Sequence, residues 1–231
     1  RKRHAPESNR ILVEPSDFRI RRFAQKRETT IIFCVDASGS TAFQRLGEAK
    51  GAVELLLADA YAGLAERSEG RVIMVDPNIR PGFIEDDVRY RDRLRRLFGV
   101  ADVVKVSDED LAWLEPGSES IAGQVAGLRR QGAGLVLVTR GGEGVEAWLP
   151  DGSQRHVAVM PVEVVDTVGA GDTFNAGFLA WLASNGCLTR EFLAAPDAEA
   201  IVEAIAQGTR VAGLTVQRAG ANPPWREELE A

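Results

Sequence analysis

Four runs of consecutive β-branched and apolar residues mark the chain, at positions 29–35, 71–75, 101–106 and 134–139. A strand that is covered on both faces of a parallel sheet shows such a continuous run, whereas a half-exposed strand alternates apolar and polar residues. The four runs therefore predict buried parallel strands. Two shorter stretches, 145–149 and 155–159, flank the turn residues Asp151 and Gly152 and predict a hairpin.

Between these stretches, apolar positions follow the spacing of amphipathic helices. The predicted helices span residues 41–67, 88–98, 108–114, 118–131, 175–182 and 198–215. Alternation of strand and helix at this spacing predicts an α/β fold of three layers, in which a mainly parallel sheet carries helices on both faces. We expect residues 29–60 and 61–231 to form one continuous fold.

Composition adds a basic N-terminal arm to this picture. Residues 1–27 hold nine Lys or Arg and three Asp or Glu, although the 231-residue chain has a net charge of −6. Such an arm can bind nucleic acid or an acidic partner, but it offers little aromatic surface for base stacking. We favour a solvated, poorly ordered arm over residues 1–28, and we expect no nucleic-acid partner.

Hydropathy and cysteine content indicate the compartment. No apolar run is long enough to span a bilayer, and no apolar signal core follows the basic start, so we expect neither a membrane partner nor export. Cys34 and Cys187 lie far apart in apolar surroundings, as free thiols do in a reducing compartment. The expected location is the cytoplasm.

Residues 166–174 combine a glycine-rich turn with the start of an apolar, small-residue helix. Backbone N–H groups of such a turn, together with the partial positive charge of a helix N-terminus, can bind a phosphate group. Asp172 would stand beside that phosphate, where a carboxylate suits a general base that takes a proton from an attacking hydroxyl. The alternative is an ordinary capped helix, since Asp and Thr are common N-cap residues.

The string D-T-V-G-A-G-D at positions 166–172 resembles the C-terminal signature of the ribokinase-like (PfkB) sugar kinases. From Tyr61 to Trp225 the chain is similar to the fructokinase branch of that family. Residues 76–80 match its D-P-N-x-R element, and residues 139–144 match its T-x-G-x-x-G element. The resemblance implies a ribokinase-like fold without the family's first half, with ATP and a small sugar as ligands.

The same resemblance implies roles for individual residues. It makes Asp172 the catalytic base and places an anion hole at Gly169, Ala170 and Gly171. The residues that it places near the nucleotide are Thr139, Gly141, Gly144, Asp166 and Thr167.

Two further elements of the family bear on the sugar and the metal. Asn78 and Arg80 would lie near the sugar or the transferred phosphate, although a surface ion pair is the simpler alternative for Arg80. The family's magnesium-associated N-x-x-E element falls at 107–110, where Ser107 replaces Asn and Asp110 replaces Glu. A hydroxyl and a shorter carboxylate can still hold metal-bound waters, so Mg²⁺ is expected with ATP.

Residues 9–60 resemble the opening of the von Willebrand factor A-type domain in the magnesium chelatase D subunit. Asp36, Ser38 and Ser40 match its D-x-S-x-S metal motif, in which a carboxylate and two hydroxyls meet a divalent cation at a strand end. The rest of that domain does not follow, so the chain is chimeric. The Asp36 loop either faces the phosphate site near Asp172 or is merely an adjacent capping loop, which we favour.

Three functions follow from these resemblances. The first, which we favour, is ATP-dependent phosphorylation of a sugar hydroxyl, of fructokinase type, impaired by the missing first half. The second is a nucleotide-binding module without turnover, and the third is a magnesium-dependent partner of a magnesium chelatase ATPase through Asp36, Ser38 and Ser40. Uncovered sheet edges in a truncated kinase would favour self-association as a homodimer.

Overall fold

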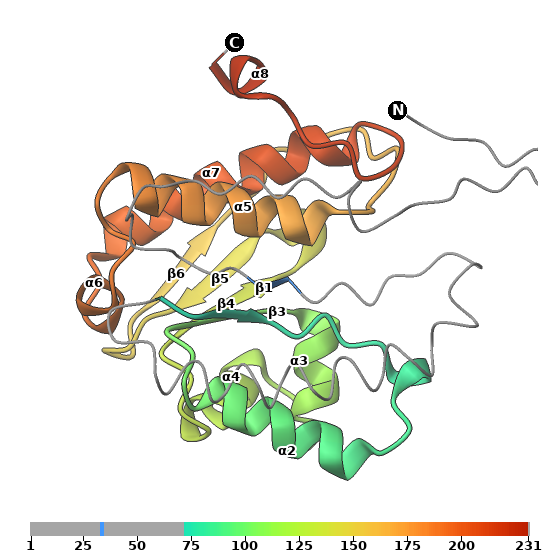
Figure 1. Cartoon of the computed structure of the whole chain (residues 1–231), viewed down its shortest axis with the longest axis vertical. Helices are drawn as coiled ribbons and strands as arrows, with labels where there is room; N and C mark the ends of the chain where they lie inside the picture. The colour runs from blue at the N-terminus through green and yellow to red at the C-terminus, as the bar shows by residue number, and fades with distance from the viewer. Residues whose placement is uncertain (1–32, 35–71, 231) are drawn as a thin grey trace, which may run out of the picture.

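The computed structural model describes residues 33–34 and 72–230, which contain a six-stranded sheet (Figure 1). In spatial order the strands are β1 (Phe33–Cys34), β2 (Met74–Asp76), β3 (Val103–Ser107), β4 (Leu135–Thr139), β5 (Val145–Trp148) and β6 (Gln154–Val157). Strands β1 to β4 pair in parallel, and β5 and β6 add an antiparallel hairpin beside β4. The predicted mainly parallel sheet is confirmed.

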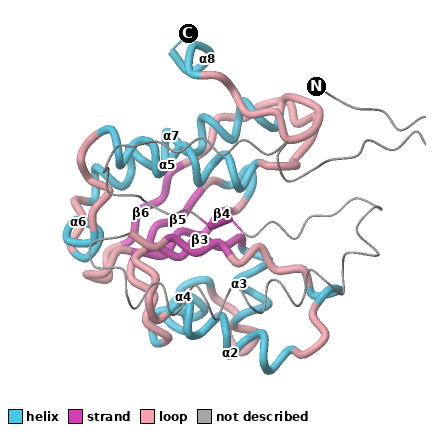
Figure 2. The backbone as a smooth tube through the Cα atoms, in the orientation of Figure 1, coloured by secondary structure: helices cyan, strands magenta, loops and turns pink. Residues whose placement is uncertain are grey.

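Helices cover both faces of this sheet, so the three predicted layers are confirmed as well (Figure 2). On one face lie α2 (Asp87–Phe98), α3 (Asp108–Leu114) and α4 (Ile121–Arg130), and on the other lie α5 (Ala170–Ser184) and α7 (Ala198–Val216). The short elements are η3 (Pro81–Phe83), η4 (Gly141–Glu143), α6 (Arg190–Ala194) and α8 (Arg226–Glu230). None of the helices in the described ranges combines the length and the apolar character that a bilayer span requires.

The central strands bury side chains on both faces. Val103 of β3 packs into the core beneath α5 and α7, while Val104 and Val106 pack into the core over α2, α3 and α4. Successive side chains of a strand point to opposite faces, so one strand serves two cores. Lys105 shares the face of Val103 by this alternation and is buried there although it is charged.

Element boundaries agree with the hydrophobic pattern apart from small shifts at the ends. The hairpin and helices α2, α3, α4 and α7 are confirmed, and α5 begins earlier than predicted, at Ala170. Helices α6 and α8 were not predicted, because five residues are too few to show helical periodicity. The arm 1–28, the helix 41–67 and the first strand apart from Phe33 and Cys34 lie outside the described residues.

Helices α5 and α7 cross where two glycines meet. A Cβ at Gly208 would lie 2.9 Å from the carbonyl oxygen of Phe174, and a Cβ at Gly177 would lie 3.0 Å from the Cα of Gly208. The lack of both side chains lets the two backbones approach closely, because an added methyl group would overlap the facing helix. This contact fixes α5, whose N-terminus carries the 166–172 motif.

Replacing Gly208 by Ala should lower the free energy of unfolding by about 1–3 kcal/mol, because the new methyl group overpacks the helix crossing. Urea unfolding followed by circular dichroism measures the change. Gly213→Ala is the matched control, since Gly213 lies in the same helix with no atom within 4 Å of an added Cβ. The control should gain about 0.5–1 kcal/mol from helix propensity, and an equal loss in both variants would contradict the close-packing account.

Candidate active site

The carboxyl ends of β2, β3 and β4 lie side by side at one edge of the sheet. The parallel register pairs Val75 with Val104 and Ser107 with Thr139. The segments 76–80, 107–110 and 139–144 therefore leave the sheet at the same edge. Open α/β sheets bind ligands outside the carboxyl ends of their strands, so the topology brings the three sequence-predicted segments to one candidate site.

The 166–172 turn brings the N-terminus of α5 to this edge. Gly169 is the N-cap residue, with a φ of 80°, and no side chain caps the helix. Glycine adopts this left-handed conformation without the steric cost that a Cβ imposes. The Ala170 N–H donates to the Thr167 carbonyl oxygen at 3.2 Å, so an anion would bind the following N–H groups, beginning with Gly171. Asp172 is exposed in the same first turn.

Asp166 ties the turn to the C-terminal segment. Its Oδ1 accepts the Val168 N–H at 3.0 Å, and its Oδ2 accepts the Gly220 N–H at 2.8 Å. These backbone hydrogen bonds, that from Val168 foremost, hold the pKa of the Asp166 carboxyl below its ordinary value. Asp166 thus shapes the loop from which α5 begins, and Thr167 lies exposed within that loop.

The T-x-G-x-x-G segment forms a compact loop after β4. Thr139 Oγ1 donates to the Val106 carbonyl oxygen at 3.3 Å, and the Arg140 N–H donates to the Gly144 carbonyl oxygen at 2.9 Å. Gly141 and Gly144 have φ values of 50° and 103°. A Cβ at Gly144 would lie 2.4 Å from the carbonyl oxygen of Val157, so this position requires glycine for space as well as for conformation.

The D-P-N-x-R segment is held in a strained conformation after β2. Asn78 has a φ of 39°, in the left-handed region that Asn tolerates better than most residues. The next N–H, that of Ile79, donates to Asp110 Oδ1 at 2.9 Å, and Arg80 Nη1 donates to the Ile79 carbonyl oxygen at 3.0 Å. Arg80 forms no ion pair with another described residue, so its guanidinium keeps donors for a ligand.

Ser107 and Asp110, the residues predicted near magnesium, form the capping box of α3. Ser107 Oγ accepts the Asp110 N–H at 3.0 Å, and Asp110 Oδ2 accepts the Ser107 N–H at 3.4 Å. Both oxygens of Asp110 therefore already accept an N–H group. Within residues 33–34 and 72–230, no group of three or more His, Cys, Asp or Glu side chains could hold a metal ion. Ser107 and Asp110 therefore act as a helix cap in this structure. A metal ion near them would be bound through water molecules.

The predicted D-x-S-x-S residues Asp36, Ser38 and Ser40 lie outside the described residues. Their proposed approach to Asp172 therefore stays a prediction.

Sequence reasoning missed a buried polar network beneath α5. Lys105 Nζ donates to Asp76 Oδ2 at 3.0 Å, and Asn175 Nδ2 donates to the same oxygen at 2.8 Å. The side chains of Lys105 and Asp76 are only 7% and 8% exposed. The signal was present in the sequence, because a lysine within a run of valines is costly to bury unless a partner carries the opposite charge.

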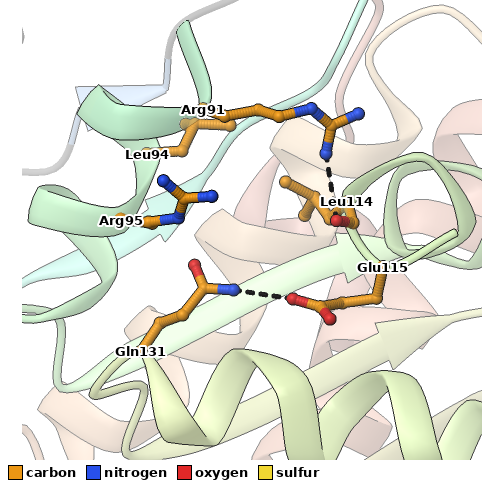
Figure 3. Close-up of a pocket in the computed structure, with 6 residues that line it drawn as sticks. All are labelled: Arg91, Leu94, Arg95, Leu114, Glu115 and Gln131. Atoms are coloured by element: carbon orange, nitrogen blue, oxygen red, sulfur yellow. Dashed lines mark hydrogen bonds between the residues drawn. The ribbon is translucent and has the colours of Figure 1, made fainter. Parts of the chain in front are cut away.

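A small pocket lies among α2, α3 and α4, apart from these segments (Figure 3). Its lining consists of Arg91, Leu94, Arg95, Leu114, Glu115 and Gln131. Gln131 Nε2 donates to Glu115 Oε1 at 2.6 Å, and Arg91 Nη1 donates to the Leu114 carbonyl oxygen at 3.0 Å. These polar groups satisfy one another, and none belongs to the predicted site segments.

Comparison with known families decides which protein class this geometry represents. The sequence pattern described as pfkB family carbohydrate kinase matches residues 28–228. The chain belongs to the pfkB family of carbohydrate kinases. The resemblance stated from the 166–172 signature is therefore confirmed.

Fructokinases are among the relatives of this pfkB family chain. It is 42% identical over 159 residues to the fructokinase of Rhizobium leguminosarum bv. trifolii, covering 65% of this chain and 47% of that protein. It is 38% identical over 167 residues to the fructokinase of Klebsiella pneumoniae, covering 72% of this chain and 52% of that protein. The chain thus spans about half the length of these relatives.

Solved structures support the ribokinase-like fold. The fructokinase with bound ATP from Xylella fastidiosa matches with a TM-score of 0.64 and 30% identity, over 71% of this chain and 52% of that one. Aminoimidazole riboside kinase from Salmonella enterica, solved with its riboside and an ATP analog, matches with a TM-score of 0.60 and 25% identity. The match covers 69% of this chain and 51% of that one.

A short segment has a different relative. Over 52 residues the chain is 64% identical to the 60 kDa subunit of magnesium chelatase from Cereibacter sphaeroides, covering 22% of this chain and 9% of that protein. The chimeric character predicted from the sequence is confirmed by this match.

Replacing Asp110 by Ala should cost about 1–3 kcal/mol of unfolding free energy, because it removes the capping box and leaves the buried Ile79 N–H without its acceptor. Urea denaturation measures the loss. Glu109→Ala, at an exposed position of the same helical turn, is the control and should change stability little. Equal stability of the two variants would show that Asp110 does not hold the 76–80 segment.

Replacing Asp166 by Ala should speed exchange of the Val168 and Gly220 amide protons at neutral pH, because both lose their acceptor. The pKa of Asp166 is lowered, so its contribution is present above the carboxyl's ordinary pKa and disappears as pH falls through the lowered value. Hydrogen exchange read by mass spectrometry measures this. Glu163→Ala, exposed in the same loop, should leave both amides unchanged; unaltered exchange in the Asp166 variant would contradict the assignment.

Proposed function

We propose that this chain carries the nucleotide-binding and phosphoryl-transfer part of an ATP-dependent sugar kinase of fructokinase type. The observation that carries the proposal is the α5 N-terminus. It has no side-chain cap, it begins at a left-handed glycine, and it has an exposed carboxylate, Asp172, in its first turn. An uncapped N-terminus offers N–H donors and partial positive charge to an anion, and a carboxylate beside that anion suits a base.

Asp172 is proposed as the general base. Its carboxylate accepts the proton of a sugar hydroxyl, which leaves the oxygen able to attack a phosphoryl group. The N–H groups that follow Ala170 stabilise the negative charge that develops on the transferred phosphate, by donating hydrogen bonds to it. ATP, when bound, would supply the γ-phosphoryl group: the bond between the γ-phosphorus and the bridging oxygen breaks as the sugar oxygen bonds to phosphorus, and ADP leaves. The chain contributes orientation and charge stabilisation rather than covalent chemistry.

The nucleotide is proposed to bind between two loops. The 139–144 loop contributes Thr139, Gly141 and Gly144, where glycines permit close approach of a ligand to the backbone. The 166–172 loop contributes Asp166 and Thr167. ATP analogs or ATP occupy the related Salmonella and Xylella kinases named above.

Asn78 and Arg80 are proposed to bind the sugar or the transferred phosphate. Their segment leaves β2 at the same sheet edge as the α5 turn, and the Ile79 N–H bond to Asp110 holds it in place. The Arg80 guanidinium has no ion-pair partner among residues 33–34 and 72–230, and a guanidinium suits a phosphate. Mg²⁺, when bound, neutralises phosphate charge; Ser107 and Asp110 would meet it through water only.

A second candidate is nucleotide binding without sugar turnover. The observation that favours it is that the chain spans only about half the length of the fructokinases it matches. A third candidate, a magnesium-dependent partner of a chelatase ATPase through Asp36, Ser38 and Ser40, draws on the 52-residue match to the chelatase subunit. Sugar phosphorylation by these 231 residues alone is expected to be slower than by full-length relatives.

Replacing Asp172 by Asn should lower the rate of fructose phosphorylation by about 10²–10⁴-fold while ATP affinity is kept, because the amide cannot accept the proton. Titration calorimetry with MgATP measures affinity, and mass spectrometry measures fructose phosphate. Asp197→Asn is the matched control, since Asp197 lies exposed at the N-terminus of α7 and caps nothing with its side chain.

The outcomes separate the candidates. ATP binding that needs Thr139, together with product that needs Asp172, supports the kinase. ATP binding without product from the unaltered chain favours the nucleotide-binding module. If no ATP binds, the kinase proposal is wrong, and Mg²⁺-dependent binding to a chelatase ATPase that Asp36→Ala abolishes would support the third candidate.

A further inference from the structure

A buried ammonium group lies directly beneath the proposed anion site. Lys105 projects from the middle of β3, and its Nζ lies 3.2 Å from the point where a Cβ on Gly171 would stand. Gly171 is the second residue of α5, in the turn whose N–H groups would bind phosphate. A side chain at this position would press on the ammonium, so Gly171 gives Lys105 access to the underside of the turn.

The carboxylate of Asp76 also lies beneath Gly171. Asp76 Oδ2 lies 3.9 Å from that point on Gly171 and accepts both the Lys105 ammonium and the Asn175 amide. The other oxygen, Asp76 Oδ1, is buried without a hydrogen bond in the described structure. Lys105 and Asn175 are therefore the donors that the described structure gives to the Asp76 carboxylate. Without Lys105, the Asp76 charge would lie unbalanced close to the α5 N-terminus, in a poorly screened interior, and would repel an incoming phosphate.

Among the described residues, Lys105 forms the ion pair with Asp76, and Asn175 adds a neutral amide donor. On the face of Lys105, its strand neighbour Val103 and its register partner Leu137 on β4 are both buried and apolar. The Lys105 charge therefore has to balance Asp76, and the sum of the two sets the potential below Gly171.

We propose that Lys105 is a positioning residue for phosphate: by neutralising Asp76 beneath Gly171, it allows the α5 N-terminus to accept an anion. The inference rests on the proposed function, because the anion is a phosphate of the nucleotide. Lys105 acts through Asp76 and the α5 turn and does not contact the reacting atoms. A purely structural ion pair would instead hold β2, β3 and α5 together without influencing the charge of what binds above them.

Single substitutions of the two partners distinguish these roles, because both break the same ion pair and leave opposite charges behind. Lys105→Met leaves Asp76 unpaired and should weaken ATP binding about tenfold or more. Asp76→Asn leaves Lys105 unpaired and should strengthen ATP binding or keep it unchanged. The double variant should return to within about threefold of the original affinity, since the net charge beneath Gly171 is restored to zero.

The measurement is calorimetric titration of the full chain with ATP, and separately with inorganic pyrophosphate, which tests phosphate recognition without the adenosine. Arg130→Met, at the exposed end of α4, controls for the loss of one positive charge far from the site. Lys105→Arg keeps the charge and should bind ATP nearly as well as the original chain. Thermal unfolding of each variant shows whether it is folded at the titration temperature.

Weaker binding in both single variants, or equal binding in all, overturns the inference and leaves the pair a structural one. If a single variant does not fold, the double variant and Lys105→Arg decide: loss of affinity in the double variant or in Lys105→Arg overturns the inference.

An unaltered chain that binds neither ATP nor pyrophosphate overturns this inference and the proposed function together. Opposite shifts without fructose phosphate support the inference while the proposed catalysis fails.

Discussion

The buried ion pair between Asp76 and Lys105 is the interaction on which the site depends. It joins the end of β2 to the middle of β3, and Asn175 extends it to α5. Removing one member of a buried pair costs about 3–5 kcal/mol, because an uncompensated charge stays in the interior. A pair of matched hydrophobic residues would hold the same elements together at less cost, so stability alone does not account for these charges.

The position of α5 has a second determinant on its opposite side. Gly177 and Gly208 let α5 lie against α7 at backbone contact, while Phe174 and Phe178 fill the core beneath. The helix is therefore held against the sheet by the polar network and the core, and against its neighbour in the same layer by the contact with α7. A helix fixed in this way presents its first turn at the sheet edge without relying on loop residues, which is what pre-organised binding of a phosphate requires.

The described strands and helices support the proposed site. The proposed nucleotide contacts lie at the end of β4, in the loop that follows it and in the loop that precedes α5. At one side of β2 to β4, β1 (Phe33–Cys34) pairs in parallel with β2.

Sequence alone determined the layer architecture and the segments of the site. Apolar runs specify buried strands, and α3 formed over residues 108–114 as predicted, because Ser107 and Asp110 cap it through local hydrogen bonds. The glycine-rich turn at 166–172 was also predicted from the sequence, and Gly169 has the left-handed backbone, at a φ of 80°, that glycine favours. The family signature was recognisable for the same reason, because its residues are consecutive.

Tertiary structure decided which distant groups meet. Asp76 and Asn175 are 99 positions apart, and no local pattern places both on one side of Lys105. The structure likewise gave Asp110 a second partner, the Ile79 N–H, 31 positions away, which the N-x-x-E resemblance did not suggest. Periodicity reports the burial of a side chain, whereas the identity of its partner depends on strand order and register, and these follow from packing of the whole sheet.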